Sequence, residues 1–184
     1  MVMMNCGYTK QQLCLMSQIQ QLWAQHVYWT RSFIISTAAS LPDLEPVTNR
    51  LLRNPKDFAA LFAPLYGMKT AGQFQELLTQ HLMLGGDLVN AAKAGDTAKA
   101  DEARKKWYQN ADEIAAFLAS VSPCWNEAKW KQMMYSHLDM TEKEAALRLQ
   151  GNYAADIQMF DEIEKEAMRM ADYMFCGMIR CCAR

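Results

Sequence analysis

Three histidines are the residues of this chain whose types and spacing could do chemistry together. His26, His81 and His137 are all the histidines in the sequence, and each falls on the apolar stripe of a different predicted helix. A buried neutral imidazole needs partners for both ring nitrogens, and leaving one unsatisfied costs about 1–3 kcal/mol. Histidines on facing helices can meet that need by binding one metal ion, and imidazole suits zinc, iron or copper. The sequence therefore predicts a metal site, with iron or zinc as the expected ion.

The depth of each side chain in a helical bundle follows from the turns that the sequence marks. His81 precedes the turn near residue 96 and Asn110 follows it, at nearly equal distances along the chain. At about 1.5 Å per residue, both lie roughly 21 Å from that end of the bundle. The next turn, near residue 124, lies almost midway between Asn110 and His137, so these two side chains are also level. An aromatic spacing shared by two segments places His26 at the same height, so we expect one polar layer.

Glu166 is the candidate that would complete a mixed nitrogen–oxygen metal site. It follows Gly151 at a distance that brings it to the calculated height of the histidines, although at the edge of its helix's apolar face. Three protein ligands leave an open coordination position for water or substrate. The alternative is that each histidine is an ordinary core residue bonded to a carbonyl or hydroxyl group. The chain has no HxxxH or ExxH pair, the compact signature of a site on one helix.

A second polar layer is predicted nearer the turn at Gly151. Asp156 lies at the centre of the apolar stripe of the last helix, and Arg148, three residues before Gly151, can face it. Glu144 continues the apolar stripe of the preceding helix. We expect a partly buried Arg148–Asp156 ion pair that fixes this hairpin; the alternative is a group that binds an anion or another ligand.

Large aromatic side chains accompany the histidines. The stretch LWAQHVYWTR contains Trp23 and Trp29, and Trp107 lies on the third predicted helix. Most such residues are ordinary core, but together these three could line a pocket for an apolar ligand. Arg31, at the end of the same stretch, reaches a height similar to that of Asp172, its expected partner.

Helices must position all of these residues. Helical periodicity runs through nearly the whole chain, and neither sustained strand alternation nor an NG or DG hairpin turn occurs. Gly95 and Gly151 are typical helix ends, and Asp96 is a typical helix start. Thr141-x-x-Glu144 has the form of a capping box, which allows the fourth helix to restart there. We expect helices at 9–40, 70–94, 97–121, 126–150 and 153–178, a connector with short helical turns at 41–69, and a frayed tail at 179–184.

The expected fold is all-α: a single antiparallel up-down bundle, residues 1–184, of four to five long helices. Two internal echoes favour a duplicated helical hairpin. His81 precedes Gly95 by the same interval as His137 precedes Gly151, and Trp23 and Phe33 match Trp107 and Phe117 at a constant offset.

Composition narrows the functional classes. The 184 residues are 51% hydrophobic and 21% charged, with a net charge of −1. The chain lacks the excess of basic residues that is typical of nucleic-acid-binding proteins, so we expect no nucleic acid as a partner. We expect no membrane association and a cytoplasmic location, since the chain shows neither a leader pattern nor about 20 consecutive apolar residues. The six cysteines form no CxxC pair. The tail CGMIRCCAR could bind a soft metal, although a frayed end is the simpler interpretation.

Four stretches carry a resemblance: LWAQHVYWTR, RLLRNPKDFA, KWYQNADEIA and GNYAADIQMFDEIEKEAMRMADY. With them the chain resembles, over most of residues 20–175, a bacterial family of short helical proteins often labelled acetylglutamate kinase. An amino-acid kinase needs an α/β fold and glycine-rich phosphate loops, which this sequence lacks, so no site residue carries over and no nucleotide cofactor is expected. More loosely, inward histidines in a bundle are similar to DinB-type metal-binding bundles, whose paired histidine motif is missing here.

The functional prediction is a metal-binding bundle of unknown reaction, either an enzyme or a sensor. The first alternative is a non-catalytic interaction or structural bundle, dimeric, in which the polar layers set helix register. The second is a bundle that binds an apolar small ligand.

Overall fold

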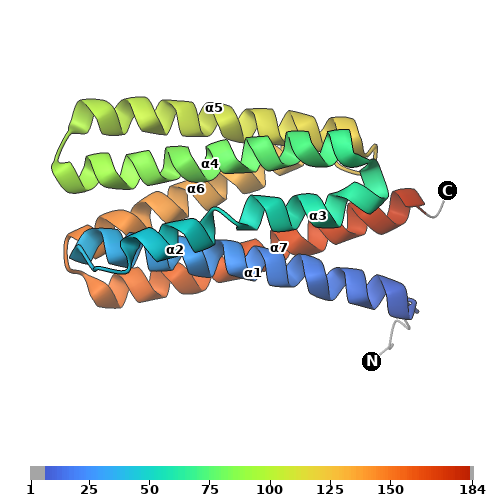
Figure 1. Cartoon of the computed structure of the whole chain (residues 1–184), viewed down its shortest axis with the longest axis horizontal. Helices are drawn as coiled ribbons and strands as arrows, with labels where there is room; N and C mark the ends of the chain where they lie inside the picture. The colour runs from blue at the N-terminus through green and yellow to red at the C-terminus, as the bar shows by residue number, and fades with distance from the viewer. Residues whose placement is uncertain (1–6, 183–184) are drawn as a thin grey trace.

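Seven α-helices make up the part of the chain that the structure, a computed structural model, describes, which is residues 7–182 (Figure 1). No strand occurs within these residues, so the all-α prediction is confirmed. Five helices are long, and residues 41–69 contain the two shorter ones. The helices are α1 (Lys10–Ala39), α2 (Leu44–Leu51), α3 (Asn54–Tyr66), α4 (Met68–Ala94), α5 (Thr97–Val121), α6 (Glu127–Leu149) and α7 (Tyr153–Cys182).

Local chemistry explains where the helices begin and end. Gly95 ends α4 in the left-handed conformation, with φ of 70°, which glycine adopts without strain. The side chains of Asp96 and Asn126 cap α5 and α6 by accepting from the backbone N–H three residues on, at 3.1 and 2.9 Å. The helix break that the sequence allowed at Thr141 does not occur. Helix α6 is continuous, and the Thr141 hydroxyl donates to the carbonyl of His137 at 2.8 Å instead of capping a new helix.

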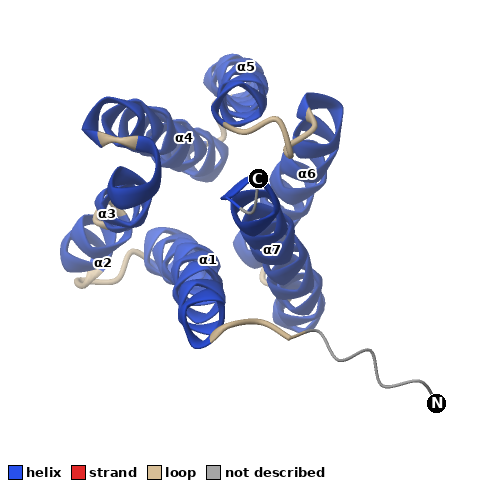
Figure 2. Cartoon of the chain, turned by 90° about the vertical axis from the view of Figure 1, so that its right-hand side faces the viewer, coloured by secondary structure: helices blue, strands red, loops and turns tan. Residues whose placement is uncertain are grey.

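The helices form a closed ring of antiparallel neighbours, seen end-on in Figure 2. Helix α1 packs against α2 and α3, α4 against α5, and α6 against α7, so the chain is a series of three hairpins. Contacts between α3 and α4, α5 and α6, and α7 and α1 close the ring. Among the described helices, none is both long and apolar enough to span a membrane.

The three hairpins repeat one pattern. Each histidine is followed, at the same interval along the chain, by a left-handed helix end, at Ser40, Gly95 and Gly151. The second helix of each hairpin carries a further equivalent set of buried residues, and one constant interval separates successive sets. These are Asn54, Ala59 and Phe62 in the first hairpin, Asn110, Ala115 and Leu118 in the second, and Glu166, Ala171 and Met174 in the third.

This arrangement is a triplicated hairpin, whereas the sequence had suggested a duplicated one. The echo between His81 and His137 marks two of the three copies. The echo between Trp23 and Trp107 relates α1, the first helix of its hairpin, to α5, the second helix of another, so it does not follow the structural repeat.

Gly85 and Gly86 lie inside α4, which runs through them without a break. Aromatic rings pack on both: a Cβ at Gly85 would lie 3.2 Å from the Trp107 ring, and one at Gly86 would lie 3.5 Å from Phe33. The first distance requires the tryptophan to move, while the second is an ordinary contact. Gly85 therefore allows the close approach of the Trp107 ring, whereas the site of Gly86 has room for a Cβ.

Gly86→Ala is expected to raise the free energy of unfolding by about 0.5–1 kcal/mol, the usual gain for alanine over glycine within a helix. Gly85→Ala, its matched neighbour, should gain less or lose stability because the Trp107 ring must shift. Urea unfolding of both variants measures the difference, and equal gains would contradict this packing.

Candidate metal centre

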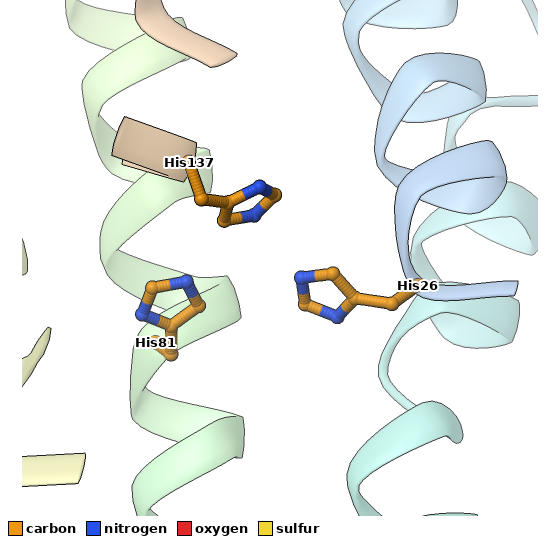
Figure 3. A group of neighbouring side chains, drawn as sticks. All are labelled: His26, His81 and His137. Carbon is orange, nitrogen blue, oxygen red and sulfur yellow. The ribbon is translucent and has the colours of Figure 1, made fainter. Parts of the chain in front are cut away.

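Three buried histidine rings converge between the hairpins (Figure 3). His26 comes from α1, His81 from α4 and His137 from α6, the first helix of each hairpin. Their side chains are 5%, 2% and 2% exposed, and one ring nitrogen from each lies within 4.8 Å of the other two. The predicted histidine layer is therefore present in the structure.

Two asparagines from the second helices hold two of the rings. Nδ1 of His26 lies 3.2 Å from Oδ1 of Asn54, and Nδ1 of His81 lies 3.0 Å from Oδ1 of Asn110. Each asparagine Nδ2 donates to the backbone carbonyl one turn before the histidine, at 3.0 and 3.1 Å. Because the amide nitrogen is committed there, the amide oxygen accepts from the ring, and Nδ1 carries the hydrogen. The lone pair of each ring is thus on Nε2, as a metal ligand requires.

The third ring, that of His137, has a glutamate instead of an asparagine at the equivalent position of its hairpin. Glu166 follows His137 at the same interval as Asn110 follows His81, so it occupies the place of the asparagines in the third hairpin. Its Oε2 accepts from Arg169 at 2.9 Å, and it is not in the cluster of ring nitrogens. Within the described residues, Nδ1 of His137 and Nε2 of His81 are buried without a hydrogen-bond partner. The structure thus brings together three of the four predicted metal ligands, and Glu166 is not among them.

Burial keeps all three imidazoles neutral at physiological pH. It lowers the pKa of His26 to about 4 and that of His81 to about 3, with the hydrogen bonds to the asparagines opposing the shift. The pKa of His137 is also well below its usual value, through burial first and then the other two histidines. Neutral rings are the form that binds metal.

The metal-free protein is expected to lose stability as the pH falls below about 6.5. The folded-state pKa values are depressed, so the unfolded chain takes up protons first, and the stability present above pH 6.5 is lost toward pH 4. Each histidine contributes up to about 1.4 kcal/mol per pH unit. The free energy of unfolding of His81→Gln should therefore fall less steeply than that of the native chain. Parallel curves for the two proteins would contradict neutral burial.

The second predicted layer is a four-residue ionic cluster. Asp156 is fully buried, and Arg31 donates to its two oxygens at 2.7 and 3.3 Å. Arg148 donates to Asp156 at 3.3 Å, so the predicted Arg148–Asp156 pair is present, and Glu144 pairs with Arg31. The predicted pairing of Arg31 with Asp172 is wrong, since Asp172 accepts from a glutamine of α1 instead.

The charges of this cluster are largely matched within it. Burial raises the pKa of Glu144 to about 7, and the neighbouring Arg31 opposes that shift. The carboxylates and guanidinium groups come from α1, α6 and α7 and are bonded to one another. The cluster therefore connects three helices through ionic contacts.

The three predicted pocket tryptophans occupy different environments. Trp23 is core, edge-on to His26 and Phe58 with ring centroids 5.8 and 5.7 Å away. Trp29 is half-buried outside the histidine layer, with the Arg50 guanidinium over its ring. Trp107 lies 5.4 Å from the His81 ring and lines an internal cavity. Of the three, Trp107 alone therefore lines a pocket at the histidines.

Of the tail CGMIRCCAR, the structure places Cys176 on α7, as a half-buried free cysteine. Helix α7 continues to Cys182, while the side chains of Cys181 and Cys182, the whole of residues 183–184 and Cys6 lie outside the described part of the structure.

Comparison with known proteins gives no relative. No family model, curated protein or solved structure matches the chain. The resemblance to the family labelled acetylglutamate kinase stays a prediction.

Proposed function

We propose that this protein binds one zinc or iron ion through His26, His81 and His137. The observation that carries the proposal is the convergence of three neutral, buried rings, two of which are turned by asparagines so that Nε2 is free. Ligand nitrogens around zinc at about 2.0–2.1 Å are roughly 3.4 Å apart in a tetrahedron. A limited inward movement of the rings reaches that spacing from separations of at most 4.8 Å.

The donor set narrows the class of metal. Three imidazoles without sulfur or carboxylate suit zinc, iron or copper better than calcium or magnesium, which prefer oxygen ligands. A three-ligand centre keeps a position open for water or substrate. A metal there would act as a Lewis acid, and the protein residues would supply orientation and a dry environment.

We assign Glu166 to the support of His137. It takes the position from which Asn54 and Asn110 accept a hydrogen bond, and a carboxylate can accept from Nδ1 of a metal-bound histidine. The Nδ1 without a partner on His137 is the group that such a bond would satisfy. In this role Glu166 orients a ligand instead of binding the metal.

Metal loading tests the proposal. Chelator-treated protein is dialysed against Zn²⁺, Co²⁺ or anaerobic Fe²⁺, and the bound metal is counted by elemental analysis. We expect one ion per chain and a thermal stabilisation, since a ligand at 1,000 times its Kd adds about 4 kcal/mol. Less than a tenth of an equivalent, with unchanged unfolding, would overturn the proposal and favour the structural bundle.

Asn110→Ala is expected to weaken metal binding 10- to 100-fold, because His81 loses the group that fixes its ring and tautomer. Competition with a chromophoric chelator measures the affinity. Asn110→Asp keeps an acceptor and should recover most of it. Equal affinities for the alanine variant and the native chain would show that the asparagine has no orienting role.

A further inference from the structure

A cavity of about 220 Å³ begins at the three histidines and extends along the bundle. Its walls come from α1, α2, α4, α5 and α6, and most of its lining side chains are aliphatic or aromatic. It lies on the side of the histidines toward Ala92 and Ala146, which line it and are exposed. The metal site is therefore at the inner end of a space that reaches the surface.

Equivalent positions in the three hairpins explain why the space is on this side only. Seven residues before the histidines stand three large, fully buried side chains, Ile19, Phe74 and Trp130. Four residues after them stand Thr30, Gly85 and Thr141, and eight residues after them Ile34, Val89 and Ala145. The repeat thus fills the bundle on one side of the histidines and leaves it open on the other.

The charge of the lining restricts what can bind. Arg104 and Glu142 are the charged residues of the wall, and the Arg104 Nε donates to both carboxylate oxygens of Glu142 at 2.8 and 3.0 Å. Three neutral imidazoles bring no negative charge to a divalent ion, and Glu166, the acid assigned to the support of His137, is itself paired with Arg169. A ligand that brings one negative charge to the metal would offset part of it.

We infer that the cavity holds a small monoanion with an apolar body, such as a carboxylate on a single ring, whose oxygen takes the open metal position. This inference rests on the proposed function. The volume exceeds the roughly 150 Å³ of a cavity that accepts benzene and is below the roughly 300 Å³ typical of drug-sized ligands. The apolar walls accommodate the ring, and the metal binds the carboxylate.

Cobalt-loaded protein provides the test, because the visible absorption of Co²⁺ reports on a new ligand. Benzoate should shift the spectrum saturably, and benzamide, similar in size but uncharged, should bind at least 10-fold more weakly. Ala145→Leu fills the cavity and should weaken benzoate binding at least 10-fold with one Co²⁺ still bound. Ala128→Leu, exposed on the same helix and outside the cavity wall, should bind as the native chain does.

Ala146→Leu gives an independent variant, since this exposed position at the cavity mouth tolerates a larger side chain if Ala145→Leu does not fold. It should also weaken benzoate binding. If Co²⁺ binds and benzoate does not change the spectrum, or both cavity variants bind benzoate normally, the inference is overturned and the metal site stands. If the native chain binds no Co²⁺, both fail.

Discussion

Asp156→Ala is expected to lower the free energy of unfolding by about 3 kcal/mol or more, as is typical when one partner of a buried ion pair is removed. Its carboxylate is fully buried and accepts from both Arg31 and Arg148. Without it, two guanidinium groups that are only 15% and 20% exposed face Glu144, whose own pKa is raised by burial. Urea unfolding at pH 7 measures the loss.

The control for this prediction is Asp139→Ala. Asp139 pairs with Lys143 on the same helix as Glu144, but both members are more than half exposed. Exposed pairs of this kind contribute roughly 0–1 kcal/mol. Similar losses of unfolding free energy in the two variants would mean that the ionic cluster does not stabilise the packing of these helices.

His81→Ala is expected to reduce metal affinity by at least 1,000-fold, more than the 10- to 100-fold expected for loss of an orienting partner. The reason is that two imidazoles remain, too few to hold the ion in competition with water. Metal titration of the native and variant chains measures the change.

Loss of folding must be separated from loss of a ligand in this experiment. Circular dichroism and thermal unfolding of the metal-free variant show whether the helical fold is intact. Gln80→Ala, which alters the exposed neighbour on the same helix, should bind metal normally. A folded His81→Ala variant that still takes up one tight ion would place the metal elsewhere.

The histidine layer could be predicted from sequence for two reasons. Helical periodicity sets the direction in which a side chain points, and the number of residues from a turn sets its depth in the bundle. His81 and His137 were placed by counting residues from predicted turns. His26 was placed at their height through the echo between Trp23 and Trp107, which does not follow the structural repeat. Asn110 was found by the same counting from turns. The long, strongly periodic helices were thus the informative part of the chain.

Asn54 was missed because it lies in residues 41–69, where prolines interrupt the helical pattern. The signal that could have found it is its spacing from Asn110, which equals the spacing from Asn110 to Glu166. The histidines do not share this constant spacing, because the interval from His26 to His81 is one residue shorter than that from His81 to His137.

Tertiary features were less accessible from sequence. The height calculation paired Arg31 with Asp172, but Arg31 donates to Asp156 on α7 and to Glu144 on α6. The cavity likewise depends on small residues of three hairpins meeting at one level. Thr30, Gly85 and Thr141 carry no individual signal for an opening.

X-ray absorption of the zinc-loaded protein tests the central claim most directly. We expect four light-atom ligands at about 2.0–2.1 Å, with the scattering of three imidazole rings, and no sulfur. A zinc–sulfur distance of about 2.3 Å, or fewer than three imidazoles, would contradict a centre built from His26, His81 and His137.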